Sequence, residues 1–65
     1  MPEFSIYIDC DNAAFEPEPG VELGRILTEV AVRLKRDPYL ETSTTGKLRD
    51  ANGNTVGKWH FVVSD

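Results

Sequence analysis

Two carboxylates one residue apart close the first apolar stretch of the chain, Ile8-Asp9-Cys10-Asp11. Enzymes of phosphoryl transfer use such strand-end carboxylates because their oxygens converge on magnesium. Those enzymes draw further carboxylates and a lysine from chains several times longer than these 65 residues. Alternation along a strand also turns Asp9 and Asp11 to the same outward face. We interpret both as solvated or helix-capping acids, and we expect no metal site and no cofactor.

The other groups with catalytic potential are isolated from one another. His60 has no evident Ser or Cys nucleophile beside it in the expected strand register. Cys10 is expected on the core-facing side of the first strand, whereas a reactive thiol needs an exposed, electropositive surrounding. Gly46, Gly53 and Gly57 precede no helix, which a phosphate-binding loop requires. These observations predict a chain that is not an enzyme.

Hydrophobic periodicity predicts one strand followed by one helix. Residues 4–11 alternate between apolar and polar side chains, as a half-buried strand does. Residues 19–36 have helical periodicity, and Pro38 ends the helix. The apolar stripe of this helix consists of Leu23, Leu27, Val30 and Leu34, widened by Ile26 and Ala31. The opposite, solvated face carries Glu22, Arg25, Glu29, Arg33 and Arg36. We expect Leu27 and Val30 to be buried against Trp59.

The second half of the chain predicts a hairpin around Asn52-Gly53, because this dipeptide favours a type I′ turn. A two-residue loop pairs Ala51 with Asn54, Asp50 with Thr55, Leu48 with Gly57, and Gly46 with Trp59. This register places Leu48, Trp59, Phe61 and Val63 on one face of the sheet.

The predicted fold is α+β, with element order β-α-β-β in a single domain spanning residues 1–65. Residues 59–63 form the most apolar strand, so we place this strand at the centre of the sheet. A right-handed connection from the first strand through the helix then gives a three-stranded antiparallel sheet of order 1-3-2. One helix covers one face, formed by Phe4, Ile6, Ile8, Leu48, Trp59 and Phe61. Such a short chain has a thin core, so self-association is one way to stabilise it.

Two surfaces are candidates for binding a partner. The outer face of the sheet combines apolar and basic side chains, the usual anatomy of a binding patch; its residues are Tyr7, Lys47, Arg49, Val56, Lys58, His60 and Val62. The second candidate is an acidic end, which would attract a basic partner; it consists of Asp9, Asp11, Glu16, Glu18 and Glu22.

Composition narrows the class of partner. The net charge of −4 argues against nucleic acid, which normally binds a basic face. No apolar run approaches the ~18 residues of a membrane span, and a lone cysteine fits a reducing cytoplasm. We therefore expect a protein partner, with a homodimer as one form of it.

Residues 11–15 and 46–57, with residues 19–27 between them, resemble a group of short, uncharacterised bacteriophage and prophage proteins. The resemblance implies a viral accessory protein in the cytoplasm of a bacterial host. Short acidic viral proteins often block host defence complexes, CRISPR machinery included, by occupying their surface. The expected function is thus non-enzymatic protein binding, with inhibition of a defence complex as one form. Two alternatives are a small nucleic-acid or nucleotide-binding module on the Tyr7 face and a structural subunit of a larger assembly.

Overall fold

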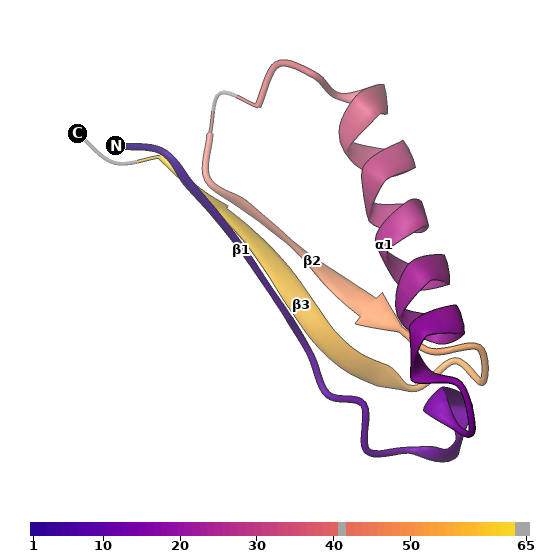
Figure 1. Cartoon of the computed structure of the whole chain (residues 1–65). Helices are drawn as coiled ribbons and strands as arrows, with labels where there is room; N and C mark the ends of the chain where they lie inside the picture. The colour runs from indigo at the N-terminus through magenta and orange to yellow at the C-terminus, as the bar shows by residue number, and fades with distance from the viewer. Residues whose placement is uncertain (41, 64–65) are drawn as a thin grey trace.

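The computed structural model describes residues 1–40 and 42–63. Its elements are β1 (Glu3–Ile8), the short 3-10 helix η1 (Ala13–Phe15), α1 (Pro19–Arg36), β2 (Thr44–Arg49) and β3 (Thr55–Val62). The strands form an antiparallel sheet of order β1-β3-β2, with α1 on one face (Figure 1). The predicted α+β fold, element order and strand order are confirmed. No helix within the described residues is long and apolar enough to cross a membrane.

The first strand ends earlier than its alternating pattern suggests. β1 stops at Ile8, and the Asp9 carboxylate then accepts the backbone N–H of Asp11 at 3.0 Å. An Asp side chain that bonds to the backbone two residues on favours a turn over a continued strand. Cys10 therefore lies beyond the sheet and is exposed, so the prediction of a core-facing Cys10 is wrong.

The hairpin loop has three residues, and the predicted type I′ turn is wrong. Asp50 donates its N–H to the Asn54 carbonyl at 2.9 Å, and Gly53 donates its N–H to the Asp50 carbonyl at 3.0 Å. A type I′ turn needs positive φ at both central residues, but among the described residues only Gly53, at +86°, has it. A glycine in the left-handed conformation after a turn is typical of a three-residue loop.

An irregularity between Leu48 and Arg49 then restores part of the predicted register. Arg49 pairs with Thr55, whereas Leu48 pairs with Gly57 and Gly46 with Trp59 as predicted. The extra residue of β3 is Val56, and it is buried in the core at 8% exposure. A one-residue bulge reverses the face that a side chain occupies. The prediction that Val56 lies on the outer face is therefore wrong.

The core is small and lies where α1 meets β2 and β3. Its buried residues are Phe15, Ile26, Val30, Leu48, Val56 and Trp59. The Trp59 indole packs directly over Gly46, where any Cβ atom would overlap it. The Phe4 ring stacks on Trp59 with the centroids 5.8 Å apart. On the helix, Val30 is buried as predicted, but the neighbouring positions differ from the prediction.

Ile26 is 2% exposed, whereas Leu27 is 46% exposed, so the expectation that Leu27 is buried against Trp59 is wrong. At 100° per residue, Glu22, Ile26 and Val30 lie along one line of the helix, and Leu27 lies at the far edge of the apolar stripe. Compared with the predicted orientation, the helix is thus rotated about its axis so that the side carrying Glu22 turns toward the core. The residues that hold it there belong to the hairpin end of the molecule.

Candidate binding surfaces

Asp50 organises the end of the molecule where α1, η1 and the hairpin meet. Its side chain is buried and accepts the backbone N–H groups of Asn52 and Asn54 at 2.9 and 2.8 Å. It also accepts the Asn12 amide at 2.7 Å, and Asn12 in turn caps η1 through the Ala14 N–H. Burial alone would raise the pKa of Asp50, but these hydrogen bonds outweigh it and lower the pKa.

Glu22 and Arg25 tie the first half of α1 to the same hairpin. Glu22 accepts the Arg25 Nε–H at 2.8 Å and the Ala51 backbone N–H at 2.7 Å, and Arg25 also donates to the Arg49 carbonyl at 3.0 Å. The hydrogen bonds from Arg25 are the main reason why the pKa of Glu22 is lowered; burial opposes them. Glu22 is only 6% exposed. Its assignment to the solvated helix face and to the exposed acidic end is therefore wrong, although Asp9, Asp11, Glu16 and Glu18 are exposed.

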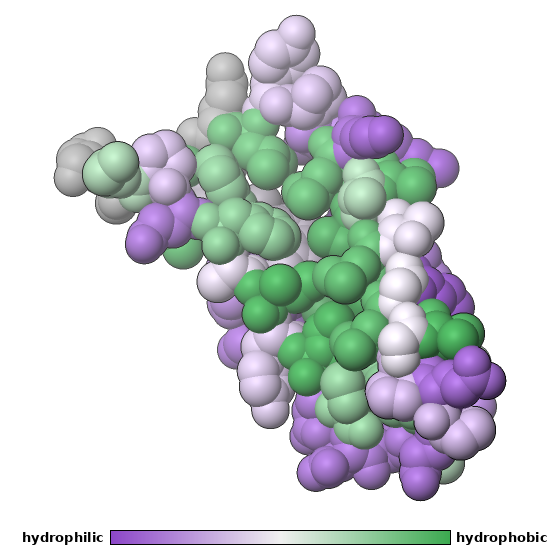
Figure 2. Space-filling model, in the orientation of Figure 1, coloured by the Kyte–Doolittle hydropathy of each residue, from purple (hydrophilic) through white to green (hydrophobic). Residues whose placement is uncertain are grey.

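This attachment leaves the β1 half of the inner sheet face uncovered. α1 is bonded to the end of β2 and diverges from the strands toward its own C-terminal end, while β1 is the edge strand away from it (Figure 1). Four apolar side chains consequently stay exposed by 36–46%, and we call them the open side: Phe4, Ile6, Leu27 and Val63. Apolar surface runs without a break from the strands across to the helix (Figure 2).

The outer face of the sheet is more polar than the sequence predicts. Register places Tyr7, Lys58 and Lys47 in one row across the three strands. Tyr7, Lys47, Arg49, Lys58 and Val62 are exposed and His60 is half-buried. The row between Tyr7 and Val62 consists of Ser5, His60 and Thr45. Because Val56 is in the core, the expected apolar centre of this face does not form.

Ser5 lies directly opposite His60 on β1, so the prediction that His60 has no serine beside it is wrong. Within the described residues no hydrogen bond joins the two side chains, and the Thr45 hydroxyl on the other side donates to the Trp59 carbonyl at 2.7 Å. A serine nucleophile needs a hydrogen-bonded base and aligned donors for the oxyanion. The arrangement here is a row of polar side chains on a flat sheet face.

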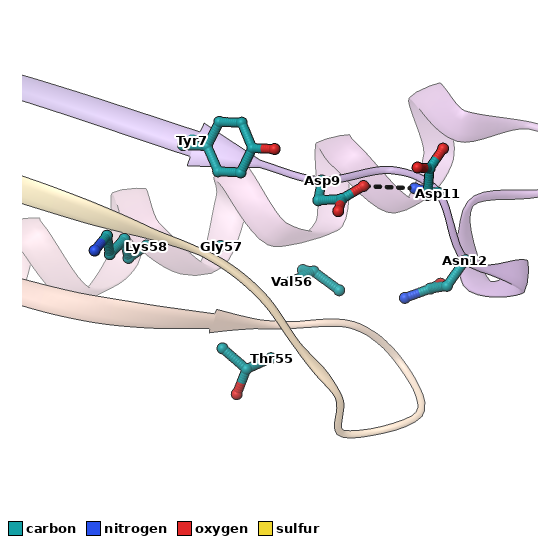
Figure 3. A pocket seen from close by; sticks show the side chains of 8 residues that line it. All are labelled: Tyr7, Asp9, Asp11, Asn12, Thr55, Val56, Gly57 and Lys58. Carbon is teal, nitrogen blue, oxygen red and sulfur yellow. Dashed lines mark hydrogen bonds between the residues drawn. The ribbon is translucent and has the colours of Figure 1, made fainter.

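A shallow hollow of about 490 Å³ lies where β1 ends, lined by Tyr7, Asp9, Asp11, Asn12, Thr55, Val56, Gly57 and Lys58 (Figure 3). The Asp9 carboxylate is directed at the Asp11 backbone, and the Lys58 side chain extends away from both aspartates (Figure 3). No group of three or more His, Cys, Asp or Glu residues in the described part of the chain is arranged to hold a metal ion. The role of Asp9 that the structure shows is to form the turn after β1.

No family model matches this chain, and no curated protein or solved structure is significantly similar to it. The candidates for a functional site are therefore the surfaces described above. Of these, the open side concentrates exposed apolar side chains. The outer face is polar, and the hollow carries the Asp9 and Asp11 carboxylates and the Lys58 ammonium on its lining. The sequence missed the open side because it follows from the rotation of α1, which depends on the Glu22 and Arg25 contacts.

Proposed function

We propose that this protein is a non-enzymatic binding module whose partner is a protein. The observation that carries the proposal is the open side, where side chains of the sheet and the helix form one exposed apolar surface. Contiguous apolar patches on small chains are typical of protein interaction sites. The unpaired edge of β1 adjoins this surface and offers backbone hydrogen-bonding groups as well.

The open side is a stronger candidate than the outer face for a physical reason. Burial of apolar area is the main favourable term in association, at roughly 25 cal/mol per Å². On the outer face Lys47 and Lys58 lie directly opposite each other, and both ammonium groups would have to be desolvated or paired by a partner. Charged groups of this kind contribute more to specificity and association rate than to affinity.

The resemblance to short bacteriophage proteins supports a more specific proposal. The partner would then belong to a bacterial host, for example a defence complex such as CRISPR machinery, and the meeting place would be the host cytoplasm. This part of the proposal rests on residues 11–15, 19–27 and 46–57 alone.

A capture experiment with matched variants tests the proposal. The purified chain serves as bait in a bacterial lysate, and bound proteins are identified by mass spectrometry. Leu27→Glu places a charge on the open side while keeping a good helix former, and we expect it to abolish specific capture.

Val62→Asp on the outer face and Glu18→Lys at the acidic end are the controls, and both should bind like the parent. Loss of binding in either control with retention in Leu27→Glu would move the site to that surface. Thermal unfolding of each variant confirms that the fold is intact.

A further inference from the structure

We infer that the open side is occupied by a second copy of this chain, with β1 pairing antiparallel to β1 of the other copy in one six-stranded sheet. The inference rests on the proposed function and names a second copy of the chain, in place of a host protein, as the partner at this surface. It follows from the two edges of the sheet, from the register that β1 permits with itself, and from the amount of surface that the chain exposes.

The two edges of the sheet differ in charge. β2 carries Lys47 and Arg49 along its length, and charged residues on an edge strand discourage pairing with another chain. Residues 4–8 of β1 carry no charge at all. Two copies of β1 can therefore approach each other without bringing like charges together along most of the strand. The β1 edge is the one that is left open to pairing.

Hydrogen-bonding geometry restricts the register of such a pair. Asp9 donates its N–H to Val56 of β3 at 2.8 Å. Because antiparallel strands alternate the direction of their backbone groups, those of Phe4, Ile6 and Ile8 point to the open edge. A second copy of β1 can hydrogen-bond to these groups, with the apolar side chains of both copies on one face, in two registers. The twofold axis that relates the two copies passes through Ser5 in one register and through Ile6 in the other.

Charge selects between the two axes. An axis at Ile6 places Glu3 opposite Asp9 of the second copy, and opposed like charges destabilise a strand pair. An axis at Ser5 instead places Glu3 opposite Tyr7, and Phe4 opposite Ile6 of the second copy. The twofold axis then stands perpendicular to the sheet, so both helices lie on the same face. The apolar side chains of β1 from the two copies become neighbours on that face, between the two helices.

The chain exposes surface on the scale that such a dimer needs. Its accessible surface is 4933 Å², whereas a compact chain of its 7.3 kDa mass exposes about 4,200 Å². Its radius of gyration is 13.0 Å, against about 10.7 Å for a compact chain of this length. The excess area is several hundred Å², similar to the ~800 Å² that each partner buries in a standard interface.

Disulfide trapping tests the register directly. Ser5→Cys is made in a Cys10→Ser background, which removes the exposed native thiol. The axis at Ser5 brings the two introduced thiols together across a non-hydrogen-bonded pair, where Cα atoms are about 4.5 Å apart and a disulfide can form. Mild oxidation should convert most of the protein to a covalent dimer. Tyr7→Cys in the same background is the matched control, because it lies on the same strand and face but opposite Glu3, and it should stay largely uncrosslinked.

Light scattering of the unmodified chain provides the second measurement, with twice the monomer mass expected at concentrations of tens to hundreds of micromolar. A monomer throughout that range, or a cross-link at position 7 as efficient as at position 5, would overturn the inference. If the chain is monomeric yet captures another protein through Leu27, the dimer fails and the proposed function stands. If Leu27→Glu changes neither self-association nor capture, the proposed function fails as well.

Discussion

Asp50 accepts hydrogen bonds from the hairpin loop and from Asn12, which lies 38 positions earlier in the chain. Part of this role could be predicted from the sequence, because Asp is favoured at the first position of a turn. The Asn12 contact and the burial of Glu22 could not be predicted. Both depend on how η1 and α1 meet the hairpin, and no local pattern encodes that arrangement.

The lowered pKa values of Glu22 and Asp50 predict loss of stability in acid. A carboxyl whose pKa is lower in the folded than in the unfolded chain stabilises the fold above its unfolded pKa. That contribution is lost as the pH falls through the lower, folded value. Urea midpoints should therefore be steady near neutrality and decrease below about pH 4.5, where unfolded carboxyls begin to protonate.

Asp50→Asn provides the control for this assignment. The amide keeps the size of the side chain but places a donor where the Asn12 amide needs an acceptor, so the midpoint at pH 7 should fall. The decrease between pH 5 and pH 3 should become shallower at the same time. A pH profile identical to that of the parent would mean that other carboxyls cause the acid sensitivity.

At the scale of elements, the sequence predicted α1 within its observed bounds, because the bounds of a helix depend on hydrophobic periodicity. It also predicted the strand order and the central strand, because these depend on strand hydrophobicity and on the rules for connecting strands. The rotation of the helix and the hairpin register near the loop were not predictable. Two small departures, a three-residue loop and the Val56 bulge, offset each other, so the pairs beyond Leu48 agree with the prediction while Val56 changes face. A period-two pattern does not signal a bulge.

The observed helix face predicts unequal effects of two adjacent substitutions. Ile26→Ala removes a fully buried side chain and should lower the free energy of unfolding by ~2–5 kcal/mol. Leu27→Ala, on the exposed edge of the stripe, should cost about 1 kcal/mol or less. Chemical denaturation of the two variants, in parallel with the parent, measures both. Equal costs would place α1 in a different rotation.

Gly53 predicts a second effect at this scale. Its φ of +86° lies in the left-handed region, where a β-branched side chain is strained. Gly53→Val should destabilise the fold by ~1–3 kcal/mol, as measured by thermal or urea unfolding. Gly53→Asn is the matched control, because Asn tolerates this conformation better, and it should retain most of the stability.

The described residues contain one long helix, α1, for three strands, and this helix is attached to the sheet at one end. Of the seven residues predicted on the outer face, five are exposed, His60 is half-buried and Val56 lies in the core. The open side was not predictable, since Phe4, Ile6 and Leu27 all belong to patterns that normally indicate burial. A helix that covers only half of a sheet looks the same in sequence as one that covers it all.

Self-association at the open side predicts that stability depends on protein concentration. Binding that favours the folded dimer raises the unfolding midpoint as concentration rises. A hundredfold increase in concentration should raise the thermal midpoint of the parent chain by several degrees. Ile6→Lys introduces a charge on the pairing strand and should remove this dependence. A midpoint that stays constant in the parent would argue for a monomer.

The position of Trp59 gives the chain a built-in optical reporter. It is the sole tryptophan, and its indole lies over Gly46 with the Phe4 ring stacked on it and the Arg33 guanidinium 5.9 Å from its centroid. Phe4 belongs to the open side, so a partner that moves or dehydrates Phe4 changes the immediate surroundings of the indole. The emission spectrum of the unlabelled protein should therefore shift when the open side is filled, and titration of that shift gives the affinity without any dye.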